Sequence, residues 1–412
     1  MPDEDTGGQA TRGTRRGVSQ DEETGGQATG KQSERRLLND KIAELTALGQ
    51  SIWIDYIRRG MIESGELAAL RDRGVAGLTS NPTIFQKAIA ESDDYTGALA
   101  DCVGRGGSAD EIYETLVFED IRGAAAIMEP VFRSTDGVDG YVCIEVNPSL
   151  AYDTAATVAE GKRIVEAIGR PNVMIKVPGT PEGLPAIEAL LTDGINVNVT
   201  LIFSVDVYRQ VMQAYLRGVK RFADAGHDPS RVASVASFFV SRIDGAVDKL
   251  LAGQIEAGRT DLSPLLGKAA IANTKLAYVA YQEVFERHDG PFAELRARGA
   301  RVQRPLWAST STKNPHYRDT YYIDTLIGPR TVNTVPPATL DALCDHLEAR
   351  ITVTQDVPEA ERVIQQLARA GIDLASVTAD LRDTGVKLFA DSFDALMADI
   401  EAKRLLQVAS PP

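Results

Sequence analysis

The sequence of 412 residues contains little cysteine. Its three cysteines, Cys102, Cys143 and Cys344, are odd in number and show no Cys-x-x-Cys spacing. This pattern argues against a disulfide framework and against a thiolate metal site, and favours a reducing compartment. The four histidines also lack the HxH and HExxH spacings of zinc sites. We therefore expect no metal, and, since no GxGxxG motif follows a predicted strand, no dinucleotide cofactor.

Basic residues are also in the minority. The formal net charge is −14, with 44 Lys and Arg against 58 Asp and Glu. Such a chain has no extended basic surface for neutralising phosphates, so nucleic acids and anionic membranes are not expected partners. A small anionic substrate is compatible with this charge, because a few local Arg or Lys side chains suffice to bind it.

Long apolar runs are missing as well. No stretch approaches the ~20 apolar residues that span a bilayer, and the acidic start Met-Pro-Asp-Glu-Asp lacks a signal-peptide pattern. We expect a cytoplasmic protein. With 43% hydrophobic and 25% charged residues, the composition is that of an ordinary globular protein with a sizeable core.

Two regions differ in composition. Residues 1–36 consist mainly of Gly, Thr, Gln and charged residues, and after Met1 the only bulky aliphatic residue among them is Val18. Such a segment cannot offset the entropy of ordering, so we predict a disordered N-terminal tail. Residues 37–412 are predicted to form one domain.

From Leu37 onward, short runs rich in Val, Ile and aromatic residues alternate with longer amphipathic segments, a pattern typical of repeated βα units. Eight strands are predicted, at Ser51–Asp55, Val75–Thr79, Tyr141–Glu145, Asn172–Val177, Ile195–Thr200, Arg231–Phe239, Val302–Ser309 and Thr331–Thr334. Helices are predicted at Gly65–Arg73, Asp110–Phe132, Ala155–Ile168, Pro181–Thr192, Val205–Ala225 and Gly267–Arg287. Eight such strands favour an α/β fold, the (β/α)8 TIM barrel, over an open sheet. The segment from Pro337 to Val408 is predicted to add only helices.

Polar residues stand at the ends of the predicted strands, where (β/α)8 barrels place their active sites. Asp55, Glu145 and Lys176 are the charged members of this set. Each has an ordinary alternative: a helix cap or salt-bridge partner for the two acids, and a surface or ion-paired residue for the lysine. Their convergence at one end of a barrel favours a catalytic site.

The motifs around these residues resemble those of the transaldolase family, in its longer bacterial branch, from about Leu37 to Gln407. The matching segments are Leu-Thr-Ser80-Asn81-Pro-Thr-Ile-Phe, Ile-Glu145-Val, Val-Met-Ile-Lys176-Val-Pro-Gly-Thr-Pro-Glu-Gly, Asn198-Val-Thr200-Leu-Ile-Phe-Ser, Ser237-Phe-Phe239-Val-Ser-Arg242 and Trp-Ala-Ser309-Thr-Ser-Thr-Lys313-Asn-Pro. The resemblance implies a barrel of the class I aldolase type that transfers a dihydroxyacetone unit between sugar phosphates through a lysine Schiff base, without a metal or an organic cofactor.

By this resemblance, the catalytic residues are Lys176, Glu145, Asp55 and Thr200. Lys176 would form the Schiff base, and its amine must lose its proton first; free lysine has a pKa near 10.4, so the site should lower it. Glu145 would move protons through a water held with Thr200, and Asp55 would be the general base during carbon–carbon cleavage.

The resemblance also implies the substrate-binding residues, which are Asn81, Ser80, Asn198, Ser237, Phe239, Arg242, Ser309 and Lys313. Asn81, Asn198 and Ser237 would hold the three-carbon fragment. Phe239 occupies the place of a Tyr in the related fructose-6-phosphate aldolases, which favours transfer over simple cleavage. Arg242 suits a substrate phosphate, because its planar guanidinium matches phosphate oxygens. Lys313 differs from the family pattern, because better-known members have an Arg on this loop.

The implied activity is that of a transaldolase of the non-oxidative pentose phosphate pathway, acting on sedoheptulose 7-phosphate and glyceraldehyde 3-phosphate to give erythrose 4-phosphate and fructose 6-phosphate. Two alternatives stay open on the sequence: a Schiff-base fructose-6-phosphate aldolase, and a non-catalytic barrel that binds sugar phosphates. The sequence also leaves the oligomeric state open.

Overall fold

The computed structural model describes residues 41–409, and in this part of the chain eight parallel strands close into a barrel in the order β1 to β8. The strands are β1 (Gln50–Ile54), β2 (Leu78–Thr79), β3 (Val142–Glu145), β4 (Val173–Pro178), β5 (Val197–Ile202), β6 (Ser234–Phe239), β7 (Arg304–Ala308) and β8 (Thr331–Val335). The predicted (β/α)8 barrel is confirmed, with every predicted strand present. The predicted tail, residues 1–36, lies outside the described residues.

The bounds of several strands differ from their predictions: β2, β6 and β7 are each three residues shorter, and β5 is shifted by two residues. The predicted strand Val75–Thr79 is regular only at Leu78 and Thr79, although Ala76 already bonds to the Ile52 carbonyl of β1. The fifth strand runs two residues beyond Thr200, to Ile202. Its pairing with β6 is shifted between Val199 and Ile202, where Leu201 has a φ of 56°. Positive φ is costly for a leucine, so this bulge is held in place by its surroundings.

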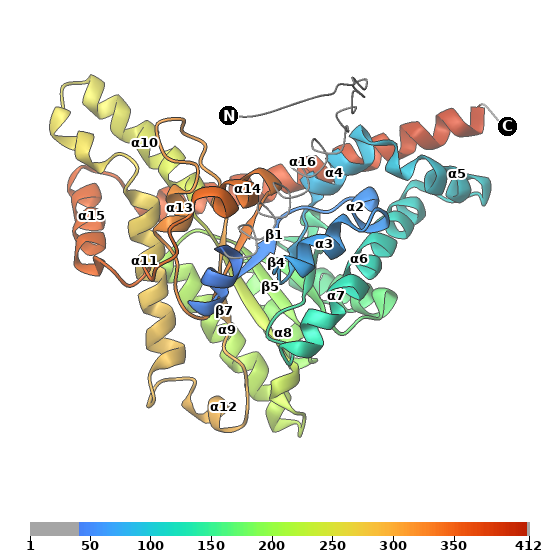
Figure 1. Cartoon of the computed structure of the whole chain (residues 1–412), viewed down its shortest axis with the longest axis horizontal. Helices are drawn as coiled ribbons and strands as arrows, with labels where there is room; N and C mark the ends of the chain where they lie inside the picture. The colour runs from blue at the N-terminus through green and yellow to red at the C-terminus, as the bar shows by residue number, and fades with distance from the viewer. Residues whose placement is uncertain (1–40, 410–412) are drawn as a thin grey trace, which may run out of the picture.

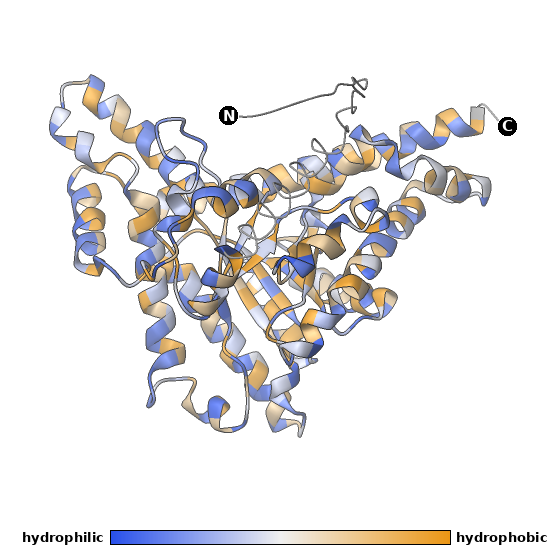
Figure 2. Cartoon of the chain, in the orientation of Figure 1, coloured by the Kyte–Doolittle hydropathy of each residue, from blue (hydrophilic) through white to orange (hydrophobic). Residues whose placement is uncertain are grey.

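Helices surround the strands, as Figure 1 shows. Up to the eighth strand they are α2 (Arg59–Glu63), α3 (Glu66–Asp72), α4 (Pro82–Glu91), α5 (Thr96–Gly104), α6 (Ala109–Ser134), α7 (Thr154–Ile168), α8 (Gly183–Thr192), α9 (Val205–Asp224), α10 (Ser241–Glu256), α11 (Ala269–Tyr281), α12 (Ala293–Ala297) and α13 (Tyr321–Asp324). In Figure 2 the strands are largely hydrophobic, whereas the helices alternate between hydrophobic and hydrophilic residues. This difference follows from position, because strands in the barrel wall are buried on both faces and helices on only one.

The six predicted helices are all present, but the predictions did not include α2, α4, α5, α10, α12 or α13. The sequence of α10 contains Gly245 and Gly253, which weaken a helical pattern because glycine is a poor helix former. The predicted helix Gly267–Arg287 begins at Ala269, and its last turn, Gln282–Glu286, is a π-helix.

The helices predicted after the barrel are α14 (Pro337–His346), α15 (Val357–Arg369) and α16 (Leu374–Ala409). Figure 1 shows α16, in red, running along the top of the molecule past α14 and α4 to the C-terminus. It packs most extensively against α4 and also contacts α5, α6 and α10. The C-terminal segment therefore forms part of the cover over one end of the barrel.

The opposite, N-terminal end of the barrel is closed by a buried ion pair. Arg304 at the start of β7 lies 2.9 Å from Oδ1 of Asp139. Asp139 also accepts hydrogen bonds from Ser51 (2.7 Å) and from the indole of Trp53 (3.0 Å). Because these groups satisfy one another away from water, this end of the barrel is a structural plug.

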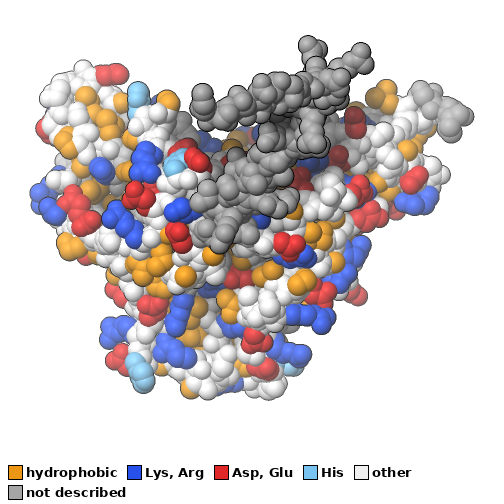
Figure 3. All heavy atoms as spheres, in the orientation of Figure 1, with side chains coloured by type: hydrophobic (Ala, Val, Ile, Leu, Met, Phe, Trp, Pro, Cys, Tyr) orange, Lys and Arg blue, Asp and Glu red, His pale blue; other side chains and the backbone are white. Residues whose placement is uncertain are grey.

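Lys, Arg, Asp and Glu side chains are interspersed over the face seen in Figure 3. Within residues 41–409, no helix has the length and apolar character needed to cross a membrane.

Candidate active site

A cavity of about 440 Å³ lies at the C-terminal end of the barrel. Its charged lining residues are Lys87, Lys176, Arg242, Lys313 and Asp55. Four cations therefore face one acid, in a chain whose net charge is −14. The lining is completed by Tyr56, Thr79, Asn81, Thr83, Ile84, Thr200, Ser237, Phe239, Ala308, Ser309, Ser311, Thr334, Pro336, Pro337 and Phe389. An excess of cations in a concave site favours an anionic ligand.

Lys176 reaches this cavity from β4. The strand pairs in register with β3, so that Lys176 stands beside Glu145. Its Nζ lies 3.3 Å from Oε2 of Glu145 and donates a 2.8 Å hydrogen bond to the carbonyl of Ser80. Only 4% of Lys176 is exposed, which is rare for a lysine and indicates a specific role for the amine.

Asp55 follows β1 and faces the same cavity. The Thr79 hydroxyl donates a 2.6 Å hydrogen bond to its Oδ1, and that hydroxyl lies 2.7 Å from the hydroxyl of Thr334. Burial raises the pKa of Asp55 above its ordinary value, although Lys176 and the Thr79 hydrogen bond oppose the shift. A carboxylate with a raised pKa is better matched to proton transfer near neutral pH.

Glu145 and Thr200 supply two further groups near the lysine. Burial raises the pKa of Glu145, while the adjacent Lys176 acts in the opposite direction. The hydroxyl of Thr200 is fully buried and has no hydrogen-bond partner among the described residues. A buried hydroxyl is rarely left unpaired, so this position suits an ordered water or a substrate atom.

Asn198 and Ser237 are joined across β5 and β6. The Ser237 hydroxyl donates a 2.7 Å hydrogen bond to Oδ1 of Asn198, whose Nδ2 points to the sulfur of Cys143 at 3.3 Å. Ser237 lines the cavity, whereas the fully buried Asn198 does not. Asn198 therefore orients the Ser237 hydroxyl in this structure.

Ser80 and Asn81 lie between β2 and α4. The Ser80 hydroxyl donates to the carbonyl of Cys143 (2.7 Å), and the contact of Ser80 with Lys176 is made by its backbone carbonyl. Asn81 lines the cavity and also caps α4, its side chain accepting a 3.0 Å hydrogen bond from the Ile84 amide. The same asparagine thus fixes the start of the helix and faces the site.

Phe239 and Arg242 form one side of the cavity. The guanidinium of Arg242 lies 5.4 Å from the centre of the Phe239 ring, and that ring packs against Phe203 at 5.1 Å. Burial lowers the pKa of Arg242, with Asp55 opposing the shift. A guanidinium desolvated in this way would be stabilised by an anionic ligand such as a phosphate.

The β7 loop brings Ser309 and Lys313 to the cavity. Ser309 has a φ of 55°, and its hydroxyl lies 3.1 Å from that of Ser241. Such strained positions cluster at functional sites. Lys313 is exposed at the cavity edge.

The structure adds cavity residues that the sequence analysis did not propose. Lys87 and Thr83 come from α4, Thr334 from β8 and Phe389 from α16. Thr83 and Lys87 are four residues apart and therefore share one helix face. That spacing is a signal present in the sequence, but only the unrecognised helix α4 gives it meaning.

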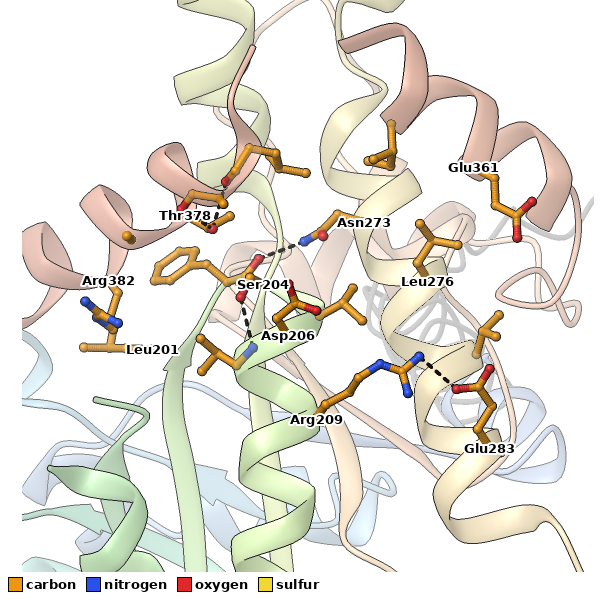
Figure 4. A pocket seen from close by; sticks show the side chains of 18 residues that line it. Leu201, Ser204, Asp206, Arg209, Asn273, Leu276, Glu283, Glu361, Thr378 and Arg382 are labelled. Carbon is orange, nitrogen blue, oxygen red and sulfur yellow. Dashed lines mark hydrogen bonds and ion pairs between the residues drawn. The ribbon is translucent and has the colours of Figure 1, made fainter. Parts of the chain in front are cut away.

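A second cavity, of about 640 Å³, lies behind β5 between α9, α11 and α16, and Figure 4 shows its lining. Both of its cations are already paired: Arg209 with Glu283 (2.8 Å), and Arg382 with Asp383 (2.8 Å). Asn273 donates to the carbonyl of Phe203, and Ser204 caps α9. Because these polar groups have partners, the barrel-end cavity is the better candidate for a catalytic site.

In residues 41–409, no three His, Cys, Asp or Glu side chains gather closely enough to hold a metal ion.

Comparison with known proteins identifies the family. Residues 52–400 match the family model described as transaldolase/fructose-6-phosphate aldolase. A transaldolase of Mycolicibacterium paratuberculosis is 47% identical over 365 residues, covering 88% of this chain and 97% of that protein. Transaldolase 2 of Nostoc is 46% identical over 371 residues, with the same coverage, and a transaldolase of Mycobacterium tuberculosis strain H37Rv is 45% identical over 366 residues. The family match begins within β1 and ends within α16, so it spans nearly all of the barrel and of the helices that follow it.

Proposed function

The chain belongs to the transaldolase/fructose-6-phosphate aldolase family, and from this premise we propose how its barrel-end cavity works. The function is that of a transaldolase: a three-carbon dihydroxyacetone unit passes from sedoheptulose 7-phosphate to glyceraldehyde 3-phosphate, giving erythrose 4-phosphate and fructose 6-phosphate. The observation that carries the site assignment is the buried amine of Lys176, which lies 3.3 Å from Glu145 in a cavity that also contains Asp55.

The first stage of the proposed reaction joins the substrate to the enzyme. The unprotonated Lys176 amine attacks the ketone carbon of the sugar, and loss of water from the carbinolamine leaves an iminium. Both steps move protons at the new carbon–nitrogen centre. Glu145, 3.3 Å from Nζ, can exchange them through a water held at the unpaired Thr200 hydroxyl.

The second stage breaks and remakes a carbon–carbon bond. Asp55 takes the proton from the hydroxyl on the carbon beyond the scissile bond, the bond breaks, and its electron pair passes into the iminium to give an enamine. The aldose phosphate leaves. The enamine then attacks the acceptor aldehyde, Asp55 returns the proton to the new alkoxide, and water releases the ketose product and the free amine. The Thr79 hydrogen bond holds the Asp55 carboxylate ready for both transfers.

The substrate is held at both ends in this proposal. The three-carbon unit is positioned by Asn81 and Ser237, and Asn198 supports it by holding the Ser237 hydroxyl. Arg242 and Ser309 bind the phosphate, joined by Lys313 and by Lys87, the cation that α4 adds to the sequence-based set. Phe239 has no ionisable hydroxyl, so it cannot protonate the enamine, and this favours transfer over the release expected of an aldolase.

The proposal is tested by borohydride reduction in the presence of fructose 6-phosphate, followed by peptide mass analysis. We expect one dihydroxyacetone-sized adduct, on Lys176, and none in the Lys176→Ala variant. Lys275, another buried lysine, donates to the Gln355 carbonyl outside the cavity, so its peptide provides an internal control in the same digest. No adduct, or an adduct on another lysine, would contradict the mechanism.

Sugar phosphates are the ligands of this proposal. A cytoplasmic location, and the lack of nucleic-acid or membrane partners, stay predictions from composition; fractionation of the cells that make the protein tests the location.

A further inference from the structure

Helix α16 lies across the C-terminal end of the barrel and is held there by hydrogen bonds to α4. The Ser392 and Thr83 hydroxyls lie 2.8 Å apart, and Gln86 donates to Asp399 at 3.2 Å. The amine of Lys403 bonds to the carbonyl of Ile89 at the end of α4. Because α4 begins directly after β2, these contacts tie a helix from the end of the chain to the cavity described above (Figure 1).

Helix α16 approaches the barrel closely at Gly385. A Cβ added to Gly385 would lie 2.8 Å from Cδ2 of Leu201, closer than real Cβ atoms approach other atoms. Leu201 is the residue with positive φ in the β5 bulge, directly after Thr200. Gly385 therefore allows α16 to rest on the strand that carries Thr200.

Phe389 lies one turn after Gly385, on the same face of α16. Its ring centre is 5.8 Å from Nζ of Lys176, it lines the cavity, and only 5% of it is exposed. No other residue of α16 lines this cavity in the described part of the chain. The helix thus delivers a single apolar side chain to the reacting amine.

We infer that Phe389 is a further residue of the reaction site, which keeps water away from the nucleophilic carbon of the enamine on Lys176, so that this carbon attacks the acceptor aldehyde instead of taking a proton. The inference rests on the proposed function. Phe389 and Phe239 would then be two apolar walls of the cavity, one from α16 and one from β6, and neither carries a group that can donate a proton.

The competing reaction that Phe389 suppresses has a defined chemistry. A proton from water adds to the nucleophilic carbon of the enamine, which regenerates an iminium. Water then adds to the iminium carbon, the carbon–nitrogen bond breaks, and free dihydroxyacetone and the Lys176 amine are released. The hydroxide left by the first step takes up the proton released in the second, so one water is consumed overall. Hydrolysis of an iminium also ends the transfer cycle, so protonation of the enamine is the step that Phe389 suppresses. A smaller side chain should therefore speed release of dihydroxyacetone relative to transfer.

The test compares Phe389→Ala and Phe389→Leu with a matched control, Phe393→Ala. Phe393 lies one turn further along α16, where its ring packs edge-on against Tyr113 at 5.2 Å and does not line the cavity. Each protein receives fructose 6-phosphate and erythrose 4-phosphate, and the readout is the ratio of free dihydroxyacetone to sedoheptulose 7-phosphate formed. This ratio compares two fates of one intermediate, so it does not depend on how much of the enzyme is folded.

We expect the ratio to rise several-fold in Phe389→Ala, to return toward the wild-type value in Phe389→Leu, and to stay at the wild-type value in Phe393→Ala. An equal ratio in Phe389→Ala and Phe393→Ala would overturn the inference, even if both variants lost activity. The borohydride adduct on wild-type Lys176 separates the two failures: an unchanged ratio with the adduct present rejects the role of Phe389 alone, whereas a missing adduct rejects the proposed function as well.

Discussion

The hydroxyl of Thr79 donates a 2.6 Å hydrogen bond to the carboxylate of Asp55, and it lies 2.7 Å from the hydroxyl of Thr334. Thr79 and Thr334 come from β2 and β8, the two strands that flank β1 in the barrel. The carboxylate at the end of β1 is therefore oriented by both neighbouring strands. In the proposed mechanism, this arrangement holds the general base in a fixed direction toward the reacting centre.

Thr79→Val should lower kcat with little change in KM. A hydrogen bond to a charged group contributes about 1.5–3 kcal/mol, so we expect a loss of roughly tenfold or more. Steady-state kinetics measure it. Thr115→Val is the control, because this exposed hydroxyl bonds to the Glu111 carbonyl on a helix outside the cavity. A Thr79→Val enzyme with wild-type kcat would show that the bond does not orient the base.

Asp55→Asn should lower kcat by about 10²–10⁴-fold, since removing a general base has effects of this size. The borohydride adduct of the bound ketose should still form, because imine formation uses Lys176 and Glu145. Intact-mass analysis distinguishes the six-carbon adduct expected here from the three-carbon adduct of the wild type. A three-carbon adduct in Asp55→Asn, formed at the wild-type rate, would assign carbon–carbon cleavage to another base.

The acid side of the pH profile depends on Asp55. Burial raises its pKa, so protonation, which removes the base, begins at a higher pH than for an exposed aspartate of pKa about 3.9. We expect kcat/KM to fall, as pH decreases, with a midpoint above that value. Thr79→Val should move the midpoint further up, because the Thr79 hydrogen bond lowers the pKa of Asp55. Circular dichroism at each pH checks that the fold is intact; a downward shift in the variant would contradict the assignment.

The cations at the cavity edge should contribute unequally to phosphate binding. Arg242→Ala should raise KM for fructose 6-phosphate by about tenfold or more, since charge-assisted hydrogen bonds contribute about 1.5–3 kcal/mol. Lys87→Ala and Lys313→Ala remove exposed charges, so roughly two- to fivefold effects are expected, and these should shrink at high salt. Lys162→Ala is the control, because Lys162 pairs with Asp193 on the outside of the barrel. Equal KM values in Lys87→Ala and Lys162→Ala would remove Lys87 from the site.

Arg304→Ala should destabilise the barrel without changing its chemistry. The variant leaves Asp139 buried without its cation, which costs about 3–5 kcal/mol in the free energy of unfolding. Urea denaturation measures this loss, and kcat of the folded variant should stay at the wild-type value because the plug lies at the other end of the barrel. Arg133→Ala, which removes an exposed pair with Glu129, should change stability by about 1 kcal/mol or less. Similar stabilities of the two variants would contradict the role of the plug.

The sequence by itself determined the barrel and most of the candidate site. Its eight apolar runs and intervening amphipathic segments report local conformation, because strand and helix periodicities are read within a few residues. The rule that parallel strands end at one edge then brought Asp55, Lys176 and Ser237 to one cavity, and the structure places all three there. The family motifs could be recognised for the same reason: each is a short, continuous segment.

Only the tertiary structure decided the rest. No local pattern indicates that Thr334 joins Thr79 beside Asp55, that the Ser80 hydroxyl turns to the Cys143 carbonyl, or that Lys87 from an unrecognised helix reaches the cavity. Phe389 is the clearest case. Its amphipathic helix could bury this face against many surfaces, and the contacts with α4 hold it against the barrel, where Gly385 lies next to the Leu201 side chain. Such choices depend on packing between segments far apart in the chain, which periodicity does not encode.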